Sequence, residues 1–193
     1  MRLVLLLGLI LWPVFAMAEA VPKAVPKAVA KAVARDENRY VDEVSVLING
    51  FGKGGAIDRQ GLQNAVAMAR AEARATALHR LQGADLDGDG AITGAELQVT
   101  SAAAAATARG RLVLYFGKAD SDADGSVSAA ELQDYATRAA LQTFGTDKAA
   151  AIYSILDYDG NKDGLVTMPE VKLAVSALAA SAKAAPAKVQ QQL

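Results

Sequence analysis

The sequence contains no cysteine and a single histidine, His79. Without cysteine the chain forms no disulfide and carries no lipid-modified N-terminal cysteine, and zinc sites of the common Cys/His types are excluded. One histidine also leaves little basis for a His-based catalytic triad. Aromatic residues make up 5% of the chain, and only Met68 and Met168 follow the apolar N-terminal segment. A methionine-rich groove that accepts many partner helices is therefore not expected.

The N-terminal segment has the pattern of an export signal. A short charged start precedes an apolar run, Leu3–Leu11, and Ala16–Ala18 supplies the small residues of a signal-peptidase site. The run is shorter than the roughly 20 residues of a membrane-spanning helix. We predict a bacterial signal peptide over residues 1–18, with cleavage after Ala20 or an uncleaved anchor as alternatives. The mature chain is then periplasmic or secreted and has no transmembrane segment.

Two segments of biased composition flank the centre of the chain. Residues 19–38 contain the four-residue repeat VPKA-VPKA-VAKA-VAR. Pro22 and Pro26 favour extended backbone in its first half, while the second half can form a helix with valine on one side and Lys or Arg on the other. We predict a solvated linker; contact of its basic residues with a membrane or cell-envelope surface is the alternative. Residues 179–193 are predicted to form a disordered, low-complexity tail.

Charge is unevenly distributed along the chain. Residues 36–178 hold 13 Lys and Arg against 20 Asp and Glu, a net charge of −7, although the whole chain carries −1. An acidic centre of this kind repels the phosphates of nucleic acid. Nucleic acid is therefore not an expected partner.

Three twelve-residue segments, 85–96, 120–131 and 159–170, share one spacing of oxygen-bearing side chains. Each has Asp or Asn at positions 1, 3 and 5, glycine at position 6, an aliphatic residue at position 8 and Glu at position 12. A hard cation such as Ca²⁺ takes about six to eight oxygen ligands, which alternate residues of a turning loop can direct to one centre. The glycine permits the sharp turn that this requires. The spacing predicts three calcium-binding loops, each holding one ion.

The predicted ligands occupy positions 1, 3, 5, 7, 9 and 12 of each loop. Position 7 offers its backbone carbonyl, position 9 a hydroxyl or a bound water, and the glutamate two oxygens. The ligand residues are Asp85, Asp87, Asp89, Ala91, Thr93, Glu96, Asp120, Asp122, Asp124, Ser126, Ser128, Glu131, Asp159, Asn161, Asp163, Leu165, Thr167 and Glu170.

A fourth segment, 50–61, has part of the same pattern. The three loops start 35 and 39 residues apart, and Gly50 stands a further 35 residues before Asp85. The segment keeps glycine at position 6 and Ile57 at position 8, but has glycine at positions 1, 3, 5 and 12; only Asp58, at position 9, is acidic. We interpret it as a degenerate copy without metal. An ordinary glycine-rich loop is the alternative, and a phosphate-binding P-loop is disfavoured because no GK[ST] element follows.

Apolar residues before and after each loop predict flanking helices. Thr or Ser stands three residues before each position-12 Glu, which is the pattern of a helix capping box. Residues 62–82 contain no Pro or Gly and predict a nearly continuous helix, with a bend in it as an alternative, and the poly-alanine run 102–106 predicts another. Gly145-Thr146-Asp147 predicts the end of one helix and the start of the next.

Residues 39–178 resemble the calmodulin-like EF-hand proteins, in which neighbouring hands pair. The resemblance rests on three loops in register and the degenerate fourth, and it implies an all-α fold of four helix–loop–helix units in two paired lobes. We number the hands by their loops: hand 1 (50–61), hand 2 (85–96), hand 3 (120–131) and hand 4 (159–170). By resemblance, hands 1 and 2 pair within residues 39–100 and hands 3 and 4 within residues 101–178. Short β-bridges then join Ile57 to Ile92 and Val127 to Val166.

The resemblance implies calcium binding rather than catalysis, and we predict that the protein is not an enzyme. Eleven carboxylates lie in the three intact loops. Their mutual repulsion opposes folding and calcium relieves it, so metal is expected to stabilise the protein. The few methionines and the export signal favour a calcium buffer or calcium-stabilised protein. The alternative is a calcium sensor or adaptor that binds an unidentified protein partner, or the cell envelope, when loaded.

Overall fold

The computed structural model describes residues 25–184, so the predicted signal peptide and the last part of the predicted tail lie outside the described residues. The fold is all-α, as the sequence predicts, with one very short antiparallel sheet. The elements in chain order are α1 (Lys27–Arg35), α2 (Glu37–Phe51), β1 (Ala56–Ile57), α3 (Arg59–Gln82), α4 (Gly94–Ala103), α5 (Ala106–Ala119), α6 (Ala129–Thr143), α7 (Thr146–Tyr153), the 3₁₀ helix η1 (Ser154–Tyr158), β2 (Val166–Thr167) and α8 (Met168–Ala184).

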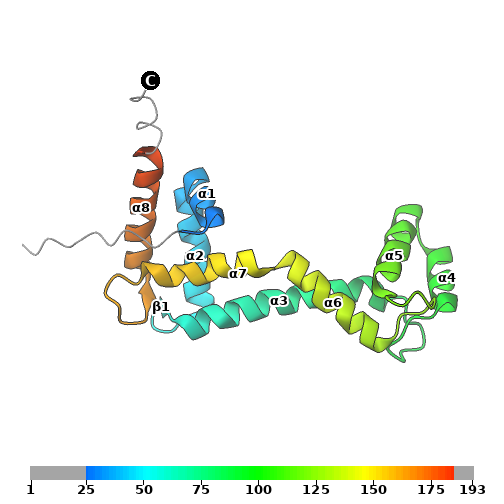
Figure 1. Cartoon of the computed structure of the whole chain (residues 1–193). Coiled ribbons are helices and arrows are strands. Elements are labelled where there is room, and N and C mark those ends of the chain that lie inside the picture. Colours follow the sequence, from blue (N-terminus) through cyan, green and yellow to red (C-terminus); the bar gives the residue numbers. More distant parts are fainter. Residues whose placement is uncertain (1–24, 185–193) are drawn as a thin grey trace, which may run out of the picture.

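The helices form two lobes joined by an elongated stem (Figure 1). The stem consists of α3 packed along α6 and α7. At one end lies the terminal lobe, which contains α1, α2, the sheet, η1 and α8. At the other end lies the distal lobe, which contains α4, α5 and the loops of hands 2 and 3. The chain therefore leaves the terminal lobe along α3, builds the distal lobe and returns along α6 and α7.

The hands pair in a nested order, and the predicted pairing of neighbouring hands is wrong. Strand β1 of hand 1 pairs with β2 of hand 4, with Ile57 opposite Val166. Hand 2 pairs with hand 3 through an isolated bridge between Ile92 and Val127. Each bridge joins position 8 of one loop to position 8 of another, as expected, but the partners are exchanged. The assignment of hands 1 and 2 to one pair, and of hands 3 and 4 to the other, fails with it.

Helix α3 is the physical reason for the nested order. It is a single helix of 24 residues, so it holds the loops at its two ends roughly 36 Å apart at about 1.5 Å per residue. Hands 1 and 2 would need a bend in this segment to lie side by side. The prediction of a nearly continuous helix over residues 62–82 is thus confirmed. This unbroken helix prevents hand 1 from pairing with hand 2.

The stem is built from small residues. Ala65 and Ala77 of α3, Ala136 and Ala140 of α6, and Ala149 of α7 are all buried. Alanine at these positions allows helix axes to approach closely, since the distance between packed helices depends on the side chains at the contact. The stem can therefore be long and thin and still exclude water.

The predicted helix break near Gly145 is confirmed, but the predicted poly-alanine helix is interrupted. Helix α6 ends at Thr143 and α7 begins at Thr146. Helix α4 ends at Ala103, and Ala104 and Ala105 have extended backbone before α5 begins. The interruption is required because α4 and α5 pack against each other, so the chain must reverse direction to bring loops 2 and 3 together.

The four position-8 residues lie at the centres of the two lobes. Ile57, Ile92, Val127 and Val166 are each 0% exposed. Ile57 and Val166 belong to the core of the terminal lobe, which also includes Leu62, Ile155, Val171 and Val175. Ile92 and Val127 belong to the core of the distal lobe. Each β-bridge is therefore also a core contact.

Both flanking segments are more structured than their composition predicts. Helix α1 lies inside the predicted solvated linker, yet Val29 and Val33 are buried in the terminal-lobe core. Helix α8 continues through the start of the predicted disordered tail, and Ala179 is buried. Within the described residues no helix is both long and apolar enough to cross a membrane.

Candidate calcium sites

The backbone of the three intact loops follows one course. Positions 4 and 6 of each loop adopt left-handed conformations, which turn the chain sharply within three residues. The φ values are +77° and +86° at Gly88 and Gly90, +61° and +87° at Ala123 and Gly125, and +60° and +84° at Lys162 and Gly164. Position 6 is glycine in every loop, as the turn favours, whereas position 4 is strained in loops 3 and 4 because alanine and lysine carry a Cβ.

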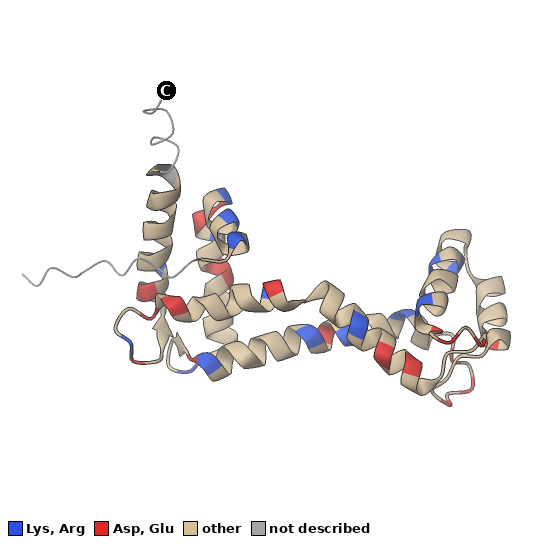
Figure 2. Cartoon of the chain, in the orientation of Figure 1, with Lys and Arg blue, Asp and Glu red and all other residues tan. Residues whose placement is uncertain are grey.

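These turns bring the predicted acidic ligands of the distal lobe together. One carboxylate oxygen from each of Asp85, Asp87 and Asp89 lies within 4.8 Å of the other two, and the same holds for Asp120, Asp122 and Asp124. Figure 2 shows acidic residues gathered in the two loops at the end of the distal lobe. Three carboxylates at this spacing repel one another, and an oxygen-seeking divalent cation would offset that repulsion.

Backbone amides hold the aspartates in place. The position-6 amide of each loop donates to the position-1 aspartate, with N···O distances of 3.1 Å at Gly90, 3.2 Å at Gly125 and 2.9 Å at Gly164. The position-7 amide donates to the position-5 aspartate in the same way, over 2.7 Å, 2.8 Å and 2.8 Å. The loops are thus pre-organised by their own amides.

Two buried carboxylate oxygens test whether the loops fit a metal ion. Oδ1 of Asp120 and Oδ1 of Asp159 are buried and have no hydrogen-bond partner among the described residues. Both belong to position 1, the first predicted ligand of hands 3 and 4. A buried anionic oxygen without a partner is costly. Calcium at the centre of each loop would satisfy both atoms, so the residues present fit the ion.

The position-12 glutamates of the distal lobe close their loops. Glu96 Oε1 accepts from the Leu86 amide at 2.8 Å, and Oε2 accepts from the amide and hydroxyl of Thr93, both at 2.8 Å. These hydrogen bonds, the Thr93 amide foremost, lower the pKa of Glu96 to about 2. In hand 3 the amides and hydroxyls of Ser128 and Ser121 lower the pKa of Glu131 to about 2. Both glutamates are ionised, as calcium ligands must be.

The same glutamates also cap the following helices. Complete capping boxes join Thr93 to Glu96 at the start of α4 and Ser128 to Glu131 at the start of α6. In hand 4 the amide and hydroxyl of Thr167 donate to Glu170 at 3.0 Å and 2.7 Å. Because the position-9 hydroxyls are engaged in this way, the geometry favours the bound-water alternative at position 9 over direct ligation.

Hand 4 differs from the hands of the distal lobe. It has three carboxylates rather than four, since Asn161 occupies position 3, and Lys162 stands at position 4. Asn161 Nδ2 donates to Asp163 Oδ2 at 3.0 Å, so the two side chains face each other. Burial raises the pKa of Glu170, but hydrogen bonds from Thr167 and Gly160 outweigh it and the net pKa is lowered. The smaller negative charge predicts weaker calcium binding here.

Hand 1 replaces the metal loop by a tight hairpin turn. Helix α2 continues to Phe51, and Gly54 and Gly55 both have positive φ, +59° and +80°, between the paired residues Lys53 and Ala56. Two consecutive positive φ values are typical of a type I′ turn. The degenerate hand therefore keeps its β-bridge and loses the course of the loop.

Position 12 of hand 1 has no space for a ligand. A Cβ at Gly61 would lie 2.6 Å from the Phe51 carbonyl oxygen and 2.8 Å from Cγ1 of Ile57. Asp58 takes the capping role of position 9 instead, accepting from the Gly61 amide at 2.7 Å. The glycine there allows close packing between α2 and α3, which a glutamate would prevent.

One contributor was missed by the sequence-based ligand assignment. Ser121, at position 2 of hand 3, donates from both its amide and its hydroxyl to Glu131 Oε1, at 2.8 Å and 2.9 Å. The corresponding residues Leu86 and Gly160 donate only their amides. A serine beside the first aspartate was the available signal, because its hydroxyl can reach the glutamate that closes the loop.

Comparison with known proteins agrees with this geometry. A family model described as EF hand matches residues 80–99 and 112–134, which contain the loops of hands 2 and 3 with the helical turns around them. No curated protein and no solved structure matches the chain. The two family matches support an EF-hand protein, and together with the two aspartate clusters they support calcium binding.

Proposed function

We propose that the protein binds three calcium ions, two in the distal lobe and one in the terminal lobe. The observation that carries this proposal is the buried, unpartnered Oδ1 at position 1 of hands 3 and 4. Hand 2 is supported by its aspartate cluster and its family match. Hand 4 lies outside the family match, so its site rests on its own geometry and on the spacing it shares with the other two loops.

The ligands of each ion would be those predicted from the spacing. Positions 1, 3 and 5 supply side-chain oxygens, position 7 a carbonyl oxygen and position 12 two carboxylate oxygens, with a water at position 9. Each glutamate would then connect the ion to the first turn of the next helix. Calcium binding would stabilise α4, α6 and α8 at their N-termini, where negative charge is also favourable.

We propose a calcium buffer or calcium-stabilised protein with a non-enzymatic role. The loops concentrate eleven carboxylates, and the repulsion among them is relieved only when cations bind. The proposed export signal agrees with this role, because extracellular modules work at about 10⁻⁴–10⁻³ M calcium. The location in the periplasm or outside the cell is part of the proposal.

A calcium-dependent adaptor is the second candidate, and the surface of the distal lobe favours it. None of the α4 residues is buried. Val99 of α4 and Val113 and Leu114 of α5 are 60%, 50% and 53% exposed, and the two helices pack against each other. Exposed apolar side chains on two packed helices offer a protein partner apolar surface to bury. An ANS titration separates the candidates: a large calcium-dependent rise in fluorescence favours the adaptor, and a small one the buffer.

Isothermal titration calorimetry of the mature chain tests the proposed sites. We expect three calcium ions per chain, and one fewer in each of Glu96→Gln, Glu131→Gln and Glu170→Gln. Asp58→Asn serves as the matched control, because Asp58 lies in hand 1 and should leave the stoichiometry at three. A wild-type stoichiometry of zero or four contradicts the proposal, and a stoichiometry of two that Glu170→Gln does not lower removes the site in hand 4.

A further inference from the structure

The four-residue repeat of the N-terminal segment forms a helix that docks on the terminal lobe. Val29 and Val33 of α1 are 2% and 3% exposed, and Val25, one repeat earlier, packs partly buried against the same core. Residues four apart lie on one face of a helix. Lys27, Lys31 and Arg35 are exposed. The repeat therefore encodes one apolar stripe for docking and a basic surface on the side away from it.

The seat of α1 is formed largely by hand 4. Helix α1 contacts α2, α7 and α8 (Figure 1). Helix α7 with η1 leads into the loop 159–170, and α8 leads out of it. The core that receives Val29 and Val33 also contains Ile155 before the loop and Val171 after it. The docked helix thus spans both sides of the one predicted calcium loop in this lobe.

Two hydrogen bonds join α2 to the elements before and after the loop of hand 4. The hydroxyls of Tyr40 and Tyr158 are 2.9 Å apart and buried, and they join α2 to the end of η1, directly before the first ligand of hand 4. On the other side of the loop, Ser176 of α8 donates to Glu37 of α2 at 3.0 Å. Helix α2 is therefore tied to both flanks of hand 4, and α1 packs on α2, α7 and α8.

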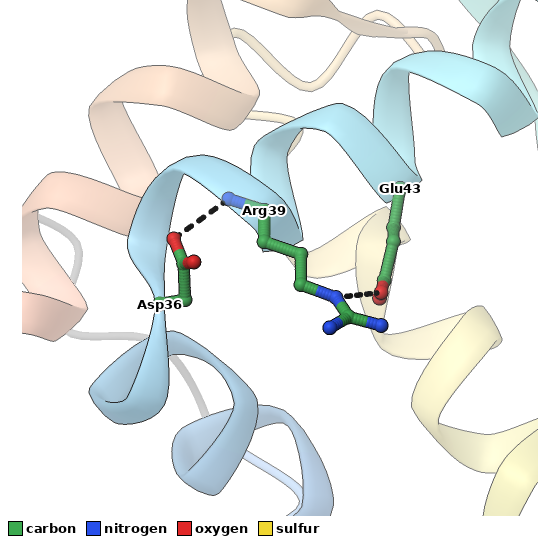
Figure 3. Close-up of polar contacts among 3 residues, drawn as sticks. All are labelled: Asp36, Arg39 and Glu43. Carbon is green, nitrogen blue, oxygen red and sulfur yellow. Dashed lines mark hydrogen bonds and ion pairs between the residues drawn. The ribbon is translucent and has the colours of Figure 1, made fainter.

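The connection between α1 and α2 is a single residue, Asp36, with φ −162°. Its side chain accepts from the Arg39 amide at 3.0 Å, and Arg39 Nε donates to Glu43 at 3.1 Å (Figure 3). These contacts cap and support the first turns of α2 without any atom of α1. The first turn of α2 therefore has a cap of its own that does not depend on the docking of α1.

We propose that α1 is an intramolecular ligand of the terminal lobe whose docking is coupled to calcium at Asp159–Glu170. This rests on the proposed calcium site of hand 4. Calcium held by residues from both ends of the loop would fix the helices before and after it relative to each other, because metal binding is coupled to folding, and α1 contacts both. The arrangement of these helices on which α1 docks is also the one in which the Asp159 Oδ1 is buried without a partner, so an ion that binds there would favour docking. By reciprocity, the docked helix raises the calcium affinity of hand 4.

Limited trypsin digestion of the wild-type chain tests the calcium-to-helix direction. We expect calcium to slow cleavage after Lys31 and Arg35 severalfold, and also after Arg109 and Arg111, which report on the distal lobe. In Glu170→Gln, calcium should still protect Arg109 and Arg111 but no longer Lys31 and Arg35. Equal cleavage of α1 with and without calcium in the wild type, or protection that persists in Glu170→Gln, overturns the coupling.

A calcium titration tests the reverse direction. In the Glu96→Gln/Glu131→Gln background only hand 4 keeps its full ligand set. Adding Val29→Ser and Val33→Ser should weaken its affinity roughly tenfold, within the usual range of coupling between sites. The matched control, Ala30→Ser with Ala34→Ser, alters exposed positions of the same helix and should change little.

The outcomes separate the coupling from the proposed function. Absence of calcium binding in the parent background contradicts the site of hand 4 and the coupling together. Binding that is the same with serine at residues 29 and 33 as in the control contradicts the coupling alone. If the serine variant loses its fold, the digestion of the wild type decides, because it leaves α1 unaltered.

Discussion

Each lobe contains a β-bridge between two position-8 residues, but the loops that the bridge joins differ. In the distal lobe, hands 2 and 3 are consecutive in the chain, each carries four carboxylates, and the bridge between Ile92 and Val127 joins two predicted calcium loops. In the terminal lobe, the bridge between Ile57 and Val166 joins a loop of three carboxylates to a hairpin turn that holds no ligands. Pairing through position 8 is thus separable from metal binding.

Hand 1 shows what pairing alone requires. It keeps a buried residue at position 8 and a capping side chain at position 9, while the turn that would collect ligands is replaced by two glycines with positive φ. The terminal lobe is therefore built by packing, with α1 and α2 adding core residues. The distal lobe has a smaller core and depends more on its loops, so it should depend more on calcium.

Gly61→Glu tests whether hand 1 can regain a calcium site, and it has the largest expected effect. Restoring the position-12 glutamate should not create a fourth calcium site, since a Cβ there meets the Phe51 carbonyl oxygen at 2.6 Å. We expect a loss of several kcal/mol in the free energy of unfolding of the terminal lobe, as large-into-tight substitutions give about 1–3 kcal/mol or more. Gly50→Ala, where the added Cβ has open space, is the control in thermal unfolding. A fourth site by calorimetry would refute this account of hand 1.

Ile57→Ala and Ile92→Ala compare the two bridges directly. Both residues are 0% exposed, so each substitution should cost about 2–5 kcal/mol. We expect Ile57→Ala to destabilise the terminal lobe and Ile92→Ala the distal lobe, read separately by hydrogen exchange of α8 and α5. Val46→Ala, at a position 69% exposed, should have little effect. Loss of protection in the same lobe for both variants would contradict the nested pairing.

Lys162→Gly should make the terminal-lobe site more like those of the distal lobe. The substitution removes a positive charge from the loop and relieves a φ of +60°, which costs a residue with a Cβ about 1–2 kcal/mol. We expect calcium to bind hand 4 roughly tenfold more tightly, measured in the Glu96→Gln/Glu131→Gln background. Ala123→Gly relieves the same strain without a charge change and should give a smaller gain at hand 3. Unchanged affinity in Lys162→Gly would show that neither strain nor charge limits hand 4.

The smallest expected effect is the acid dependence of the calcium-free distal lobe. The pKa values of Glu96 and Glu131 fall from 4.5 to about 2 on folding. A depressed pKa contributes stability that is present above pH 4.5 and is lost as pH falls toward 2. We expect the thermal midpoint of the calcium-free protein to decline in that window, and to decline less in Glu96→Gln/Glu131→Gln. A decline centred above pH 5 would assign the effect to other groups.

The sequence was sufficient for the local structure of the intact loops. The spacing of Asp, Gly and Glu predicts the turns, and the Thr or Ser at position 9 predicts the caps, because both depend on residues within twelve positions of each other. The continuity of α3 was equally accessible, since residues 62–82 lack Pro and Gly. The pairing of the hands was not predictable in this way. The resemblance implies that neighbouring hands pair, whereas the rigidity of α3 decides which loops can meet.

Docking of the N-terminal repeat also escaped sequence analysis. The valines of α1 are small and interleaved with basic residues, which is equally typical of a solvated linker. Their burial depends on a seat made from α2, α7 and α8, elements that come together only in the folded terminal lobe. In the same way, residue 61 must be glycine because Phe51 and Ile57 approach it closely, and no spacing within the loop encodes that approach.

An NMR calcium titration of Glu131→Gln tests the central claim, that hands 2 and 3 form one calcium-binding unit and hand 4 a separate one. The amides of Gly90, Gly125 and Gly164 each donate to the first aspartate of their own loop, so their resonances report the three loops individually. We predict that Glu131→Gln abolishes the response of Gly125, moves the midpoint of Gly90 to higher calcium and leaves Gly164 unchanged. A shifted midpoint at Gly164 with an unchanged one at Gly90 would contradict the account.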